Sequence, residues 1–98
     1  MLLMMSRMMK WQAYDSRFKG RTIVDLRNKP ITDDKLPRIE NFRAAQVLDL
    51  EGTLITDDGL SSVYKLKNLY CVVLKNTNVT HAGVTKLQQS IPRLWIWY

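Results

Sequence analysis

Hydrophobic and polar residues alternate in short stretches that recur at a constant distance along the chain. Leu26, Leu50 and Leu74 each end such a stretch and are 24 residues apart. Strict alternation predicts a strand, because strand side chains point to opposite faces in turn. The same spacing relates three threonines and the branched residues before them: Thr32, Thr56 and Thr80; Ile31, Ile55 and Val79. A fixed period of about 20 to 50 residues indicates a repeat architecture.

After each predicted strand and turn, apolar residues recur at three- and four-residue steps, which predicts a helix. In the second stretch these are Leu60, Val63 and Leu66, and in the first they are Leu36, Ile39 and Phe42. The pattern predicts three strand–turn–helix repeats, at 21–45, 46–69 and 70–94, and a terminal aromatic strand at 95–98.

The third repeat contains one extra residue, because Leu94 follows Leu69 by 25 positions. We therefore expect Trp97 in the inward position of Leu48 and Val72, where its ring would close the far end of the core.

Residues 1–20 are predicted to form a separate amphipathic helix that ends near Gly20. Apolar and aromatic residues from Met1 to Phe18 recur at helical spacing, with basic residues mostly opposite. A repeat array exposes its core at each end, so the favoured interpretation is a cap over the first repeat. A mitochondrial presequence and a segment that docks onto a larger complex are the alternatives.

Composition and charge narrow the classes of function. Of the 98 residues 46% are hydrophobic, enough for one core, and no apolar run approaches the ~20 residues of a membrane-spanning helix. The net charge of +6 divides into +4 for residues 1–21, −3 for residues 22–60 and +5 for residues 61–98. A dedicated nucleic-acid binder would carry a continuous basic face instead. The single cysteine, Cys71, favours a reducing compartment, and we expect a cytoplasmic protein.

Paired acids follow the threonines of the first two repeats and suggest a metal or acid–base site: Asp33 with Asp34, and Asp57 with Asp58. The favoured interpretation is structural, because Thr32 and Thr56 are predicted N-caps and acids in the next turn complement the helix dipole. His81 takes the place of the first acid in the third repeat and is expected at the surface. No phosphate loop, catalytic carboxylate pair or nucleophile elbow is present. We therefore expect no enzyme activity, no cofactor and no metal site.

The predicted binding surface is the sheet face that points away from the helices. Its residues alternate with the inward leucines. Aromatic side chains rimmed by charge are typical of protein-binding hot spots. The alternative is that its aliphatic column only supports the sheet by cross-strand packing. The predicted partner-binding residues are Asp25, Arg27, Gln46, Asp49, Glu51, Tyr70, Cys71, Val73, Lys75, Trp95 and Tyr98.

These motifs resemble those of leucine-rich repeat proteins. The spacing of Leu69, Val72, Leu74, Thr77 and Val79 is similar to the strand-and-turn signature of that family. The Ile-Thr-Asp-x-Gly-Leu sequence is similar to the 24-residue repeats of bacterial, planctomycete-like members. The resemblance covers residues 21–98 and implies a short right-handed α/β solenoid, with a parallel sheet on its concave side and helices on its convex side.

Two features depart from this resemblance or extend it. Lys29 stands where later repeats have Thr53 and Thr77, so the side-chain ladder of the turns is expected to begin in the second repeat. A weaker resemblance, to the mitochondrial coupling-factor-B-like group, rests on the Lys10-Trp11-Gln12 segment and Tyr14.

The family is a scaffold for many partners, so the resemblance implies a non-catalytic protein-interaction module that binds another protein through its concave face. A small subunit or assembly factor of a larger membrane or mitochondrial complex, docked through its basic residues 1–19, is the first alternative; membrane contact is expected only through these residues. A weak nucleic-acid binder that uses the basic ends is the second. No small-molecule substrate is expected, and a homo-oligomer stays open.

Overall fold

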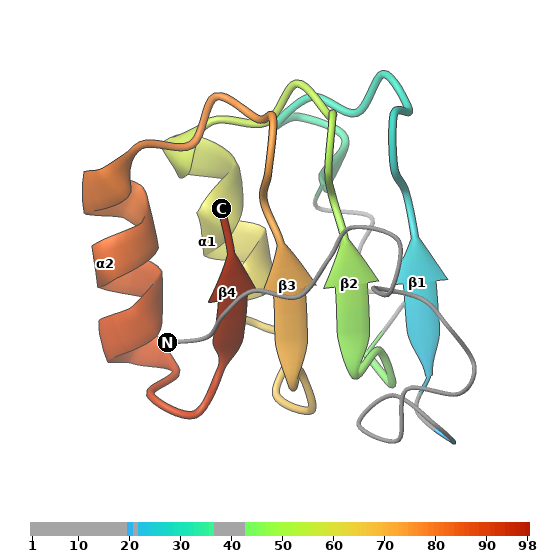
Figure 1. Ribbon diagram of the computed structural model, residues 1–98, viewed down its shortest axis with the longest axis vertical. Helices are drawn as coiled ribbons and strands as arrows, with labels where there is room; N and C mark the ends of the chain where they lie inside the picture. Colours follow the sequence, from blue (N-terminus) through green and yellow to red (C-terminus); the bar gives the residue numbers. More distant parts are fainter. Residues whose placement is uncertain (1–19, 21, 37–42) are drawn as a thin grey trace.

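A computed structural model of the chain describes residue 20, residues 22–36 and residues 43–98. The predicted capping helix and most of the first predicted repeat helix lie outside these residues. Four strands form one parallel sheet with the spatial order β1-β2-β3-β4 (Figure 1). Their bounds are β1 (Ile23–Asp25), β2 (Val47–Asp49), β3 (Cys71–Val73) and β4 (Trp95–Trp97).

Two helices follow the second and third strands. A 3₁₀ turn, Asp57–Gly59, leads into α1 (Leu60–Val63), and the longer α2 spans His81–Ser90. Thr56 is the N-cap of the 3₁₀ turn, as predicted, and Thr80 is the N-cap of α2. The Thr80 hydroxyl accepts a hydrogen bond from the Gly83 N–H at 3.2 Å, which satisfies one of the free donors of the first turn.

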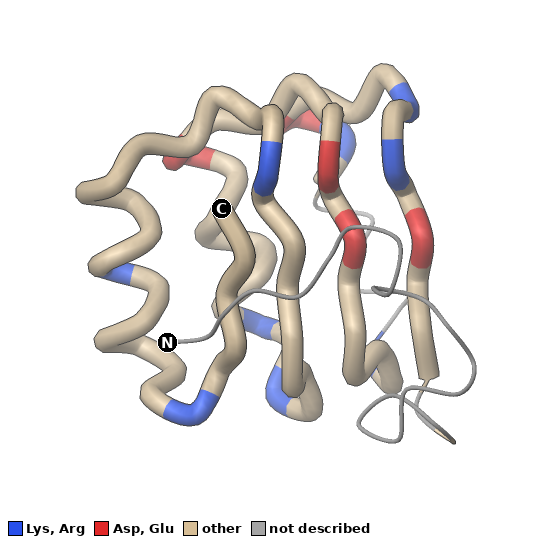
Figure 2. The backbone as a smooth tube through the Cα atoms, viewed as in Figure 1, with Lys and Arg blue, Asp and Glu red and all other residues tan. Residues whose placement is uncertain are grey.

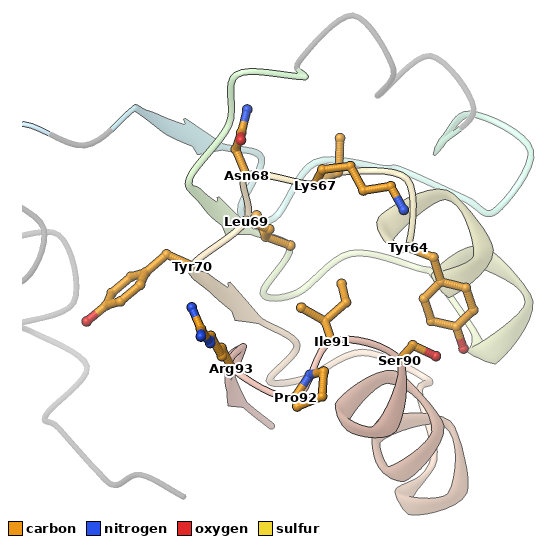
Figure 3. Close-up of a pocket in the computed structure, with 10 residues that line it drawn as sticks. Tyr64, Lys67, Asn68, Leu69, Tyr70, Ser90, Ile91, Pro92 and Arg93 are labelled. Atoms are coloured by element: carbon orange, nitrogen blue, oxygen red, sulfur yellow. The ribbon is translucent and has the colours of Figure 1, made fainter.

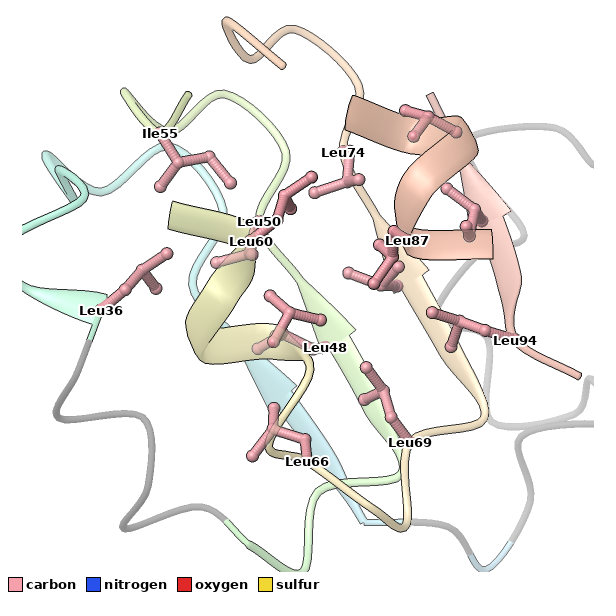
Figure 4. Packing of buried hydrophobic residues seen from close by; sticks show 14 residues of the cluster. Leu36, Leu48, Leu50, Ile55, Leu60, Leu66, Leu69, Leu74, Leu87 and Leu94 are labelled. Carbon is pink, nitrogen blue, oxygen red and sulfur yellow. The ribbon is translucent and has the colours of Figure 1, made fainter. Parts of the chain in front are cut away.

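The core lies between one face of the sheet and these two helices (Figure 4). Leu48, Val72 and Ile96 come from β2, β3 and β4, and they share one cluster with Val63 of α1 and Leu87 of α2. All five side chains are almost fully buried. The molecule is therefore a small α/β fold whose helices pack against one face of a parallel sheet.

The strand register is uniform, which corrects the predicted position of the terminal aromatics. Val72 pairs with Ile96, and Cys71 pairs with Trp95, so the 24-residue spacing continues into β4. Ile96, not Trp97, takes the inward position. The expectation of an extra residue in the third repeat is therefore wrong, because the distance from β3 to β4 equals that from β2 to β3. Leu94 still reaches the core, although it stands one position later in the repeat than Leu69.

A residue with a positive φ angle recurs in the turns after the first three strands. Asn28, Gly52 and Asn76 are 24 residues apart and have φ angles of 60°, 74° and 58°. This left-handed conformation is open to glycine and tolerated by asparagine, but costly for most other residues. Sequence spacing and backbone conformation therefore agree at these turns.

A threonine closes two of these turns, as expected. The Thr53 hydroxyl donates to the Leu50 carbonyl at 2.7 Å, and the Thr77 hydroxyl donates to the Leu74 carbonyl at 2.6 Å. Lys29 stands at the equivalent position after β1. The prediction that this side-chain ladder begins in the second turn is confirmed.

Candidate binding surface

The predicted binding face is only partly accessible. Asp49, Glu51, Cys71 and Val73 are each at most 2% exposed, so they add no open surface. The other seven predicted residues are accessible. Four are exposed, Asp25, Arg27, Lys75 and Tyr98, and three are half-buried, Gln46, Tyr70 and Trp95. The accessible part of the predicted surface is therefore its rim.

Charged residues at the carboxyl ends of β1 and β2 bind one another. The Arg27 guanidinium contacts Asp25 through Nε at 3.0 Å and Nη2 at 2.9 Å, and its Nε lies 3.4 Å from Asp49 Oδ2. The hydrogen bond to Asp25 is the main reason that the pKa of Arg27 is raised, with help from the charges of Asp49 and Glu51. Arg27, Asp25 and Asp49 are therefore already paired with one another within the fold.

The opposite end of the face carries an aromatic pair. The rings of Tyr70 and Trp95 stack with centroids 5.6 Å apart and an interplanar angle of 24°. Both rings pack against the buried Val47 and Cys71, and both are half-buried. Such a pair combines apolar area with polar atoms at its edge, the combination that is enriched at interfaces.

Two predicted residues have roles within the fold. Gln46 accepts a hydrogen bond from the Thr22 N–H at 3.0 Å through its side-chain oxygen. Tyr98, expected on the binding face, instead directs its hydroxyl to His81 Nδ1 at the start of α2, at 3.3 Å. The register explains this difference, because Trp97 takes the place beside Val73.

The first acid of each predicted pair binds the threonine that follows it by 23 residues. Asp57 accepts from the Thr80 N–H at 2.8 Å and from its hydroxyl at 2.5 Å. Asp33 binds Thr56 in the same way, with the N–H at 2.8 Å. Both Thr80 contacts, the hydroxyl first, lower the pKa of Asp57. Both acids thus have a structural role, and it is carried by contacts with the next turn, which the helix-dipole interpretation did not include.

Glycines leave the space that these carboxylates occupy. A Cβ atom on Gly83 would lie 2.2 Å from Asp57 Oδ1, and one on Gly59 would lie 2.4 Å from Asp33 Oδ1. The second acids act locally, since the Thr32 hydroxyl donates to Asp34 and thereby lowers its pKa. Among the described residues, no group of three or more His, Cys, Asp or Glu side chains is placed to hold a metal ion. None of the described helices has the length and apolar character needed to cross a bilayer.

A groove beside the aromatic pair was not predicted from the sequence. It has a volume of about 670 Å³ and lies between the segment that enters β3 and the segment that enters β4 (Figure 3). Tyr70 belongs to both the groove and the predicted binding face. The lining residues are Tyr64, Leu66, Lys67, Asn68, Leu69, Tyr70, Ser90, Ile91, Pro92 and Arg93.

The 24-residue spacing offers a reason for the groove. Ser90 follows Leu66 by 24 positions, and Leu66 is fully buried whereas Ser90 is exposed. A small polar side chain therefore stands where the preceding segment fills the space with leucine. This difference is visible in the sequence, and it could have indicated a hollow at the end of α2.

Neither a scan against protein-family models nor a search of curated protein sequences finds a match for this chain.

Proposed function

We propose that the protein is a non-catalytic interaction module that binds another protein. The observation that carries this proposal is the Tyr70–Trp95 stack, which lies where the strand face meets the groove. Partly exposed aromatic rings beside a hollow are the usual anchors of protein interfaces, where a few such residues supply most of the binding energy. The binding surface then comprises the aromatic pair and the groove, not the buried centre of the face.

We also infer that residues 21–98 form a short right-handed solenoid of the leucine-rich repeat type. Three observations support it: the pairing of strand residues at a constant 24-residue distance, the equal backbone conformations of Asn28, Gly52 and Asn76, and the carboxylate–threonine contacts between successive turns. In such an array the segments that enter successive strands lie side by side. A groove between two of them is a natural place for a partner.

The experiment is site-specific photo-crosslinking in an extract of the native host. A photoreactive amino acid at the exposed Asn68 is expected to capture a defined partner, whereas the same probe at Gln89, on α2 and outside the groove, should not. The double variant Tyr70→Ala/Trp95→Ala should lower the yield by at least about tenfold, because an anchor residue contributes roughly 2 kcal/mol or more.

A second variant separates binding from folding, because Tyr70 and Trp95 also pack on Cys71. Ser90→Trp should fill the groove from an exposed position and leave the core in place, as circular dichroism would verify. It should abolish the crosslink in a folded protein. A crosslink unchanged in both folded variants would contradict the proposal.

A further inference from the structure

We infer that the groove, as the binding site of the proposed function, takes an acidic linear segment of the partner protein. Lys67 and Arg93 come from its two opposite walls, and both are exposed. Leu69 and Ile91 lie between them on the same two walls (Figure 3). The matching ligand is a short stretch in which carboxylates flank an apolar side chain.

The distribution of charge over the molecule favours an acidic ligand at this end. Residues 61–98 contain five basic side chains and no acidic one. The described acids all lie at or after the carboxyl ends of the strands (Figure 2). The groove lies at the opposite ends, where the chain enters β3 and β4. A carboxylate in the groove therefore meets two basic side chains and, among the described residues that line the groove, no acidic one, which favours both its approach and its retention.

The groove is held in shape by hydrogen bonds before any ligand arrives. Gln88 Nε2 donates to the carbonyls of Leu94 at 2.8 Å, Pro92 at 3.3 Å and Ile91 at 3.4 Å, which fixes the turn that carries Arg93. On the other wall, Asn68 Nδ2 donates to the Arg43 carbonyl at 3.3 Å. Binding to a preformed site loses less conformational entropy than binding to a mobile one.

A peptide fits these features better than a nucleic acid does. Proteins that bind single strands use a basic groove that tracks many phosphates and aromatic faces open to the bases. Here two cations line the groove, and the ring of Tyr70 is already stacked on Trp95. Leu69 and Ile91 supply apolar surface on the walls of the groove, and a phosphate backbone would make no favourable contact with it.

The test is fluorescence polarisation with the whole 98-residue chain and three labelled probes. The first is a short peptide in which glutamates flank a Leu-Tyr pair, the second has glutamine in place of every glutamate, and the third is oligo-uridylate. The glutamate peptide should bind, and the glutamine peptide should bind about 3- to 30-fold more weakly, as expected when two exposed ion pairs are lost.

Matched variants locate the effect. The double variant Lys67→Glu/Arg93→Glu should bind the glutamate peptide at least about tenfold more weakly than the wild type does. The double variant Lys29→Glu/Lys86→Glu makes the same change in net charge outside the groove, and its affinity for the peptide should fall much less. Equal losses in the two variants, equal binding of the two peptides, or tighter groove-dependent binding of oligo-uridylate would each overturn the inference. If the crosslink at Asn68 still depends on Tyr70 and Trp95, the interaction module stands although its acidic ligand does not.

Discussion

The Asp57 side chain shows how much of the fold depends on single polar residues. Its two oxygens accept from the N–H and the hydroxyl of Thr80, a residue in the following turn. The same hydroxyl accepts from Gly83 and so begins α2. One carboxylate thus orients the group that caps the next helix. An acid that looks reactive in the sequence is used to join two neighbouring segments.

This contact makes stability depend on pH in a predictable direction. Because the pKa of Asp57 is lowered in the folded state, its contribution is present above the unfolded value of about 4 and is lost as the pH falls through the lower, folded value. Asp57→Asn should therefore lower Tm at pH 7, and its Tm should fall less than that of the wild type between pH 7 and pH 3. Thermal unfolding followed by circular dichroism measures both.

Asp58→Asn is the matched control. Asp58 contacts Thr56 and Ser61 through its backbone atoms, which the substitution keeps. Between pH 7 and pH 3, the Tm of Asp58→Asn should fall by as much as the Tm of the wild type does. A fall for Asp57→Asn as steep as that of the wild type would show that the Thr80 contact does not stabilise the carboxylate.

At the scale of elements, the start of α2 packs closely against the preceding turn, because Gly83 leaves space for the Asp57 carboxylate. Intrinsic helix propensity alone predicts that Gly83→Ala stabilises the helix by about 1 kcal/mol. We expect the reverse, a loss of about 1–2 kcal/mol, because the new Cβ would lie 2.2 Å from Asp57 Oδ1 and displace that carboxylate from Thr80. Urea denaturation gives the free energy of unfolding.

A double-mutant cycle identifies the cause of that loss. In the Asp57→Ala background the clash is absent, so Gly83→Ala should become neutral or stabilising. Gln89→Ala, at an exposed position of the same helix, should be close to neutral in either background. A loss of the same size with and without Asp57 would place the cause elsewhere in α2.

The sequence predicts the elements that repeat at a fixed distance, but it does not predict the structure where the repeat pattern changes. The positions of β1, β2 and β3 follow from leucines at a fixed distance, and the turn threonines follow from the same spacing. The register of β4 did not, because Leu94 suggests one inserted residue, whereas β3 and β4 pair at the same 24-residue distance as β2 and β3. Similarly, the alternation of residues identifies which side chains lie on the strand face. It does not predict that the centre of this face is buried or that a groove lies beside it, because both depend on how neighbouring segments pack.

For the whole molecule, burial is uneven across the sheet. The strands β2 and β3 are buried along their full length, whereas Ile23 of β1 is 38% exposed and Val24 is only half-buried. The side chains around the groove pack beside β3 and β4, at the better buried end of the core. A binding site on the more firmly packed half of a small domain loses little through local opening.

This gradient predicts the order of amide hydrogen exchange. Leu26, Leu50 and Leu74 stand at equivalent positions, and their N–H groups donate to the next strand at 2.9, 3.0 and 2.6 Å. Since the bonds are alike, differences in exchange should report local opening, and we expect Leu26 to exchange at least about tenfold faster than Leu74. Two-dimensional NMR in deuterated water resolves the three amides. Equal protection at all three would mean that the sheet opens only by global unfolding, in which case β1 is as firmly held as the strands beside the groove.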